Sequence, residues 1–178
     1  RLITKEIQAI DGQSLALKSA DGSTAMTIGS GAPTFPNKPA FEAWFTGSNQ
    51  AINSGTNVTI IYNNVEQQGG TNFSTTSGKF TVPVSGIYFF ALLNNVYSVN
   101  ANNYARHGVL FNGTGFSTDE QHILGYWTVG DTGDHTLSSS FVRKLTAADT
   151  VQPFIRTEDA SEASAGRMWQ NFSGFLVG

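Results

Sequence analysis

The residues whose chemistry could support catalysis are few and widely separated. The chain has no cysteine, so neither a thiolate nucleophile nor a soft sulfur ligand is available. Its three histidines, His107, His122 and His135, lack the His-x-x-x-His spacing that presents two imidazoles to one zinc ion. We therefore expect no catalytic residue and no cofactor.

Serine and glycine provide no alternative site. Ser138, Ser139 and Ser140 lack the Gly-x-Ser-x-Gly turn that exposes a nucleophilic serine, and the alternation around them is typical of a strand. The glycines at 69–70 and 113–115 are not followed by Lys-Ser/Thr or by a helix, so they indicate turns rather than phosphate-binding loops. The sequence predicts a protein that is not an enzyme.

Asp131 and Asp134 are oxygen ligands close together in the segment Gly-Asp-Thr-Gly-Asp-His. Their spacing does not match an EF-hand loop. Two interpretations are open, a solvated turn and a calcium site. We favour the turn and predict no metal.

Tyr126 and Trp127 are the candidates for recognition, since they lie in the long connection 113–136 between turn-rich flanks. Binding residues concentrate on loops that a rigid scaffold positions. Aromatic side chains offer broad contact faces on which sugars stack. The alternative is that both residues belong to another core or interface strand.

The composition indicates that β-strands position these residues. Charged residues make up only 13%, and the chain has 19 Gly and 13 Phe, which suits pleated strands and tight turns. The net charge of −3, with scattered Lys and Arg, argues against nucleic acid as a partner. No apolar run approaches the roughly 20 residues that span a bilayer, and the first residues lack the apolar stretch of a signal peptide. We expect no membrane insertion.

The chain divides into a repeat segment and one domain. Residues 1–32 carry Asp-Gly pairs at 11–12 and 21–22, each a turn signal followed by alternating apolar residues. This pattern predicts short strands that pack on the domain or intertwine with other subunits, the alternative being a loosely held leader. The Pro-rich residues 33–38 form a linker, and 39–178 form the main domain.

The main domain contains short apolar runs separated by turn-rich stretches, which is the pattern of a sandwich or barrel. These runs cover residues 58–62, 79–93, 108–111, 137–145, 151–156 and 168–177.

The run 86–93 is apolar on both faces. One face carries Ile87, Phe89, Ala91 and Leu93, and the other carries Tyr88, Phe90 and Leu92. The closing run, with Phe175, is also apolar on both faces. Exposing such a face would cost roughly several kcal/mol, so it must be covered, either by a symmetric oligomer or by a loop of the same chain. We expect Tyr88, Phe90, Leu92 and Phe175 in the core or in a subunit interface.

Residues 39–178 resemble the complement 1q-like globular domain, a trimeric jelly roll related to the tumour necrosis factor superfamily. The resemblance is carried by Tyr62, Gln68, Phe73, Phe80, Gly86, Tyr88, Phe90 and Leu92 at the family's spacing. The segments 39–41, 112–113, 148–151 and 172–176 look like the family's entry strand, two turns and closing strand. Four positions depart from its usual residues, namely Tyr62, Gln68, Leu92 and Ala148.

The resemblance implies an all-β jelly-roll β-sandwich that forms a homotrimer. It implies that the closing strand lies beside the strand of Tyr88 and Phe90, with one face toward the three-fold axis. Domains of this type sometimes bind calcium near the trimer apex, which is the basis for considering Asp131 and Asp134.

The N-terminal Asp-Gly repeats look like strand repeats of tailed-bacteriophage virion and tail-fibre proteins. No collagen-like Gly-X-Y period occurs. We therefore expect a virion structural protein, the head of a tail fibre, spike or appendage on the particle surface. Its partners would be other virion proteins and a host-surface carbohydrate or protein. The alternative is a secreted lectin or signalling domain of cellular origin.

Overall fold

The computed structural model describes residues 13–29, 33–53, 55–99, 103–113, 123–128, 133–158, 164–165 and 170–177. Within these ranges the regular elements are all β-strands. Their bounds are β1 Leu15–Lys18, β2 Thr24–Ile28, β3 Ala40–Trp44, β4 Gln50–Ala51, β5 Val58–Thr59, β6 Asn64–Gln68, β7 Phe73–Ser74, β8 Lys79–Thr81, β9 Gly86–Val99, β10 Tyr104–Phe111, β11 Ile123–Thr128, β12 Gly133–Leu145, β13 Thr150–Thr157, β14 Ser164–Ala165 and β15 Asn171–Leu176.

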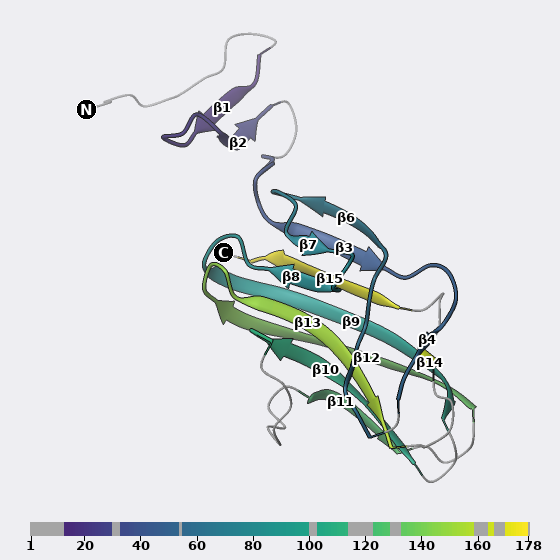
Figure 1. Ribbon diagram of the computed structural model, residues 1–178. Helices are drawn as coiled ribbons and strands as arrows, with labels where there is room; N and C mark the ends of the chain where they lie inside the picture. The colour runs from purple at the N-terminus through teal and green to yellow at the C-terminus, as the bar shows by residue number, and fades with distance from the viewer. Residues whose placement is uncertain are drawn as a thin grey trace.

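The main domain is a sandwich of two antiparallel sheets, as Figure 1 shows. Sheet I has the order β4-β14-β9-β15-β3-β6, with β12 along the other edge of β9. Sheet II has the order β11-β10-β13-β8-β7, with β5 also beside β13. The predicted position of the closing strand is confirmed, because β15 pairs with β9 on one side and with β3 on the other. The all-β jelly-roll sandwich is confirmed as well.

The core between the sheets is dominated by aromatic rings. Tyr88, Phe90 and Leu92 of β9 are buried there. Phe90 stacks on Phe172 of β15, with ring centroids 5.8 Å apart. Gly174 lies opposite Phe90, and a Cβ at this position would lie 2.5 Å from Phe90 Cδ1. Glycine therefore allows the closing strand to pass close to the ring.

Three segments differ from the sequence-based expectation. The run 79–93 is two strands, β8 and β9, because Pro83 lies between them and cannot donate to a sheet ladder. The run 58–62 forms only the short strand β5. The connection 113–136 contains a strand, β11, so Tyr126 and Trp127 are strand residues.

The N-terminal strands β1 and β2 form a separate hairpin, which projects from one end of the sandwich in Figure 1. In its turn, Asp21 accepts hydrogen bonds from Ser19 Oγ and from the Ser23 hydroxyl and backbone N–H. These bonds lower the pKa of Asp21 to about 2. The hairpin therefore has a well-bonded turn, as its Asp-Gly signal predicts.

Hydrogen bonds tie the residues between hairpin and sandwich to both. Asn37 Nδ2 donates to Thr24 O at 2.9 Å, and Thr27 pairs with Thr34 through two backbone bonds. On the sandwich side, Gln68 Nε2 donates to Phe35 O at 2.9 Å. The described part of the connection is thus bonded rather than a free tether.

Candidate functional site

The outer face of sheet I carries an apolar strip, which we define as Ile87, Phe89, Val142 and Phe175. Val142, Phe89 and Phe175 are paired in register across β12, β9 and β15. The rings of Phe89 and Phe175 are 5.3 Å apart. Ile87 is 44% exposed, Val142 62% and Phe175 45%. A soluble face of a sandwich usually carries polar residues at such positions, so the strip indicates a contact surface.

Charged residues lie at the two sides of the strip. On one side Lys144 is opposite Ile87. On the other side Glu42 and Glu66 lie directly opposite one another on β3 and β6, and both line an open surface groove of about 500 Å³. Like charges in opposed positions of a sheet are unfavourable. Asn171 Nδ2 donates to Glu42 Oε1 at 2.8 Å, which offsets part of this repulsion. This side of the face therefore favours a basic partner.

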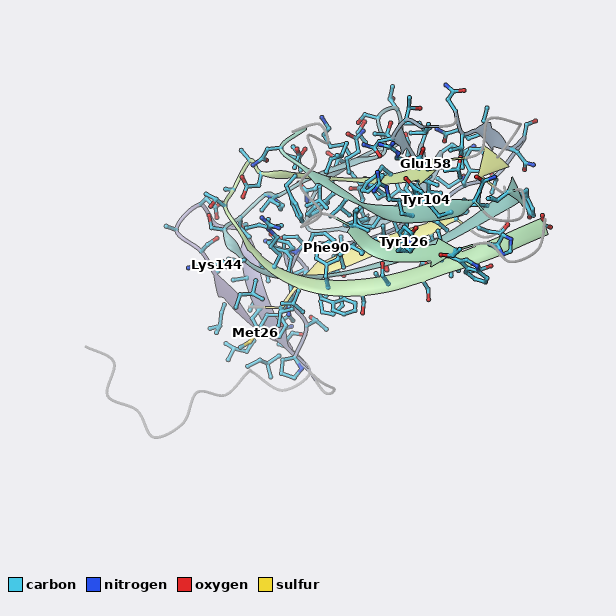
Figure 2. The ribbon with its side chains drawn as sticks, turned by 90° about the horizontal axis from the view of Figure 1, so that it is seen from below. Met26, Phe90, Tyr104, Tyr126, Lys144 and Glu158 are labelled. Atoms are coloured by element: carbon cyan, nitrogen blue, oxygen red, sulfur yellow. The ribbon has the colours of Figure 1, made fainter. Side chains whose placement is uncertain are left out.

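The outer face of sheet II carries a different set of side chains, the Tyr–Arg face, which we define as Tyr104, Arg106, Tyr126, Arg156 and Glu158. The Tyr104 and Tyr126 rings stack with centroids 5.1 Å apart. Arg106 is opposite Tyr126 on one side and Arg156 on the other. Figure 2 shows Tyr104, Tyr126 and Glu158 close together, away from Lys144. Strands β10, β11 and β13 bring these residues to one surface.

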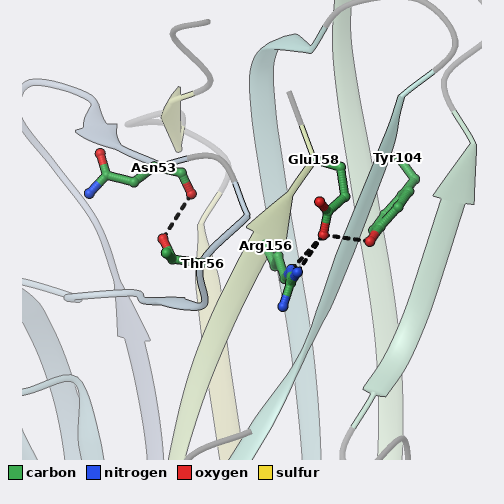
Figure 3. A network of polar contacts seen from close by, with 5 residues as sticks. All are labelled: Asn53, Thr56, Tyr104, Arg156 and Glu158. Atoms are coloured by element: carbon green, nitrogen blue, oxygen red, sulfur yellow. Dashed lines mark hydrogen bonds and ion pairs between the residues drawn. The ribbon is translucent and has the colours of Figure 1, made fainter. Parts of the chain in front are cut away.

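Glu158 is the acceptor that organises this face (Figure 3). Its Oε1 accepts from the Tyr104 hydroxyl at 2.5 Å and from Arg156 Nε at 2.7 Å, and Arg156 Nη2 lies 2.6 Å away. The hydrogen bonds from Tyr104 and Arg156 hold the pKa of Glu158 below its usual value. Desolvation and the bond to Glu158 raise the pKa of Tyr104. At neutral pH the carboxylate is thus charged and the phenol neutral.

Tyr126 and Trp127 do not form one site, because successive residues of a strand point to opposite faces. Tyr126 is 60% exposed on the outer face of sheet II. The Trp127 ring instead contacts His135 of β12, with centroids 4.6 Å apart. Tyr126 therefore points to the outer face, whereas Trp127, 38% exposed, lies on the other side of β11 against His135, and a role of either residue in recognition stays a prediction.

A polar network that the sequence did not predict joins the two sheets inside the core. His107 of β10 is 0% exposed. Its Nδ1 lies 3.0 Å from Asn94 Nδ2, and its Nε2 lies 3.1 Å from Ser139 Oγ. The Tyr62 hydroxyl donates to Asn94 Oδ1 at 3.3 Å. The polar pair 94–95 inside a long apolar run was the only sequence signal for it.

Ser139, His107 and Asn94 have the order of a nucleophile, a base and an orienting group, but their protons are wrongly placed for catalysis. Asn94 donates from its amide nitrogen, so neutral His107 accepts at Nδ1 and carries its proton on Nε2. That nitrogen donates to Ser139 and cannot take the serine's proton. Desolvation lowers the pKa of His107 to about 4, so the ring is neutral at pH 7 and serves as a structural tie.

The structure describes only one residue of the acidic pair. Asp134 is exposed in β12, while Asp131 and His122 lie outside the described residues. Among the residues that the structure describes, no group of three or more His, Cys, Asp and Glu side chains is arranged to hold a metal ion. The calcium hypothesis stays a prediction. In the same ranges, no helix is long and apolar enough to cross a membrane.

Comparison with known proteins places this fold. The model of the C1q domain family matches residues 40–177. The globular domain of zebrafish complement 1qA is similar with a TM-score of 0.53 and 19% identity, covering 79% of this chain and 98% of that one. Murine APRIL at pH 5.0 gives a TM-score of 0.54 at 11% identity, covering 79% and 99%. Eiger TNF from S. frugiperda gives 0.51 at 11%, covering 80% and 94%. No curated protein matched.

At such identities these structural likenesses concern the fold alone. The family match is of another kind, because it spans the sandwich from β3 to the end of β15. On that match, the chain belongs to the C1q domain family.

Proposed function

We propose that this protein is a non-enzymatic homotrimeric head domain of a tailed-bacteriophage tail fibre, spike or appendage, which attaches the particle to the host surface. C1q-like domains form homotrimers and are in general binding domains without enzymatic activity. The phage context is supported by the Asp-Gly repeats, of which the second forms the turn between β1 and β2.

The apolar strip is the observation that carries the assembly part of the proposal. Full burial of a Val, Ile or Phe side chain contributes about 1.5–3 kcal/mol. The four side chains of the strip are already partly covered, so a subunit interface would gain roughly several kcal/mol per subunit from them. That gain favours association of subunits through this face.

Charge complementarity favours a second copy of this chain as the occupant of that face. Lys144 lies on one side of the strip, and the Glu42–Glu66 pair lies on the other. A head-to-tail interface that closes into a ring would bring the basic side of one subunit to the acidic side of the next. The repulsion between the two glutamates would then be offset by the neighbour's lysine.

Light scattering of the purified chain tests the assembly. We expect a mass three times the chain mass of 19.1 kDa. Val142→Glu places a charge in the strip and should give a folded monomer. Thr81→Glu, an equal change at an exposed position of sheet II, should remain trimeric. A wild-type monomer would refute the proposal.

Attachment is proposed for the Tyr–Arg face, because Tyr126 is exposed there on a strand rather than on a loop. Adsorption of the fluorescently labelled trimer to host cells should fall when Tyr126 is replaced by Ala. Trp127→Ala is the matched control, since its ring lies on the opposite side of the same strand and packs on His135. Equal loss in both variants would count against this face as the binding site.

A further inference from the structure

The Tyr–Arg face contains two arginines on neighbouring strands. Arg106 and Arg156 are paired directly opposite on β10 and β13. Like charges in this position destabilise a sheet. Among the described residues, the carboxylate bonded to this pair of strands is that of Glu158, so two positive charges face one negative charge there. The excess of one positive charge requires an explanation.

Glu158 forms an ion pair with Arg156, whereas Arg106 acts on the carboxylate through its charge without a direct contact. Both contacts between guanidinium and carboxylate come from Arg156. Among the described residues, Arg106 has no hydrogen bond or ion pair, and its Nε is buried without a partner. Its Cζ lies 5.7 Å from the centroid of the Tyr104 ring, and its charge contributes to the lowered pKa of Glu158. A guanidinium that has no hydrogen-bonded carboxylate can bind an anion that presents two oxygens in one plane.

The aromatic pair beside Arg106 limits the kind of anion. Tyr126 is opposite Arg106 in register and largely exposed. The Tyr104 ring stacks on the Tyr126 ring. Tyr104 is held in turn by the hydrogen bond from its hydroxyl to Glu158. Such a rigid aromatic surface offers the broad contact that a sugar ring needs. Because Glu158 lies close by, a singly charged group fits the net charge of the face better than a doubly charged phosphate.

We propose that the Tyr–Arg face binds a pyranose that bears a carboxylate, in an acidic cell-surface polysaccharide; this assignment rests on the attachment function proposed above. Arg106 receives the carboxylate through its terminal nitrogens, and Tyr126 receives the face of the ring. Arg156 and Glu158 hold Tyr104, and hence the aromatic pair, in position.

Titration of the intact trimer with three oligosaccharides of equal length tests this assignment. An oligogalacturonate and an oligosialic acid carry the carboxylate on different sugars, and a malto-oligosaccharide carries none. We expect one or both acidic chains to bind and the neutral chain to bind at least about tenfold more weakly. The acidic chain that binds identifies the sugar.

Variants of Arg106 test the contributions of its charge and of its planar guanidinium group. Arg106→Gln should weaken the acidic ligand at least about tenfold, because a charge-assisted bond is lost. Arg106→Lys keeps the charge without the planar fork and should give an intermediate affinity. It also serves as the second variant if the glutamine substitution lowers stability. Lys18→Gln removes the same charge from the exposed hairpin and should leave binding unchanged.

Either of two binding results would overturn the assignment. A separate adsorption assay then shows whether the attachment function still stands. Equal binding of the neutral and acidic chains, unaffected by Arg106→Gln, would refute the acidic sugar. So would the absence of binding to all three probes. In either case, if Tyr126→Ala still reduces adsorption to encapsulated bacterial cells, the attachment function stands and only the ligand class fails. If adsorption is unchanged, both fail.

Discussion

The two outer faces of the sandwich differ in a way that a simple two-sheet protein does not require. The outer face of sheet I presents the apolar strip, with Val142 and Phe175 widely exposed. The outer face of sheet II presents arginines, a glutamate and stacked tyrosines. Apolar surface is most stable when a permanent interface removes it from water, whereas charged and aromatic groups can stay exposed to water and bind a ligand. The proposed functions therefore assign assembly to one sheet and recognition to the other.

Both sheets pack on the same core, so a substitution that disrupts the core should affect both outer faces. Phe90 is 0% exposed and contacts rings of both sheets. Phe90→Ala should lower the free energy of unfolding by about 3–5 kcal/mol, because it leaves a cavity between the sheets. Chemical denaturation measures this loss. A variant with unchanged unfolding free energy would show that the two faces do not depend on a shared core.

Acid should weaken the tie between the sheets. His107 has a pKa of about 4 in the folded chain, against about 6.5 when unfolded. Between these values the unfolded chain binds a proton that the folded chain does not, so stability is complete above pH 6.5 and falls as the pH drops toward 4. The expected loss is about 3 kcal/mol.

Denaturation curves at pH 7.5 and 4.5 measure this effect, and His107→Gln supplies the control. Glutamine can still bond to Asn94 and Ser139 but does not titrate. The variant should therefore lose part of the difference between the two pH values. An identical pH dependence in the variant would assign the acid sensitivity to other groups.

The smallest change tests whether the two faces act independently. Phe175→Ala removes the stack on Phe89 and should weaken trimer association by about 1 kcal/mol per contact, beyond the lost apolar area. Dilution followed by light scattering measures it. At concentrations where the trimer persists, the affinity of the Tyr–Arg face should not change. A parallel loss of ligand affinity would show that recognition depends on the assembled interface.

The alternation in residues 86–93 predicted a strand with two apolar faces, and the family spacing predicted the sheets. Alternation alone could not decide which face lies inside, because Phe89 and Phe90 are equally apolar. The packing shows which face lies inside. Phe90 fits against Phe172 and Gly174 in the core, whereas Phe89 packs on Phe175 on the outer face.

Local sequence patterns could not predict the Tyr–Arg face. Arg106 and Arg156 meet because β10 and β13 pair in one register, and a shift by one residue would separate them. The packing of the His107 ring could not be predicted from local sequence patterns either. Its ring requires Gly125 on the neighbouring strand, since a Cβ there would lie 2.6 Å from Nε2. Only long-range pairing reveals such a requirement.

The central place of β15 has a consequence for the order of events during synthesis. It fills the gap between β3 and β9, and Gly174 pairs with Phe41, so sheet I closes only through contacts very distant along the chain. Such contacts form slowly. β15 also contributes Phe175 to the apolar strip. In the proposed trimer, a nascent subunit would lack part of its contact face until residues 171–176 have left the ribosome, which would keep incomplete chains from joining their neighbours too early.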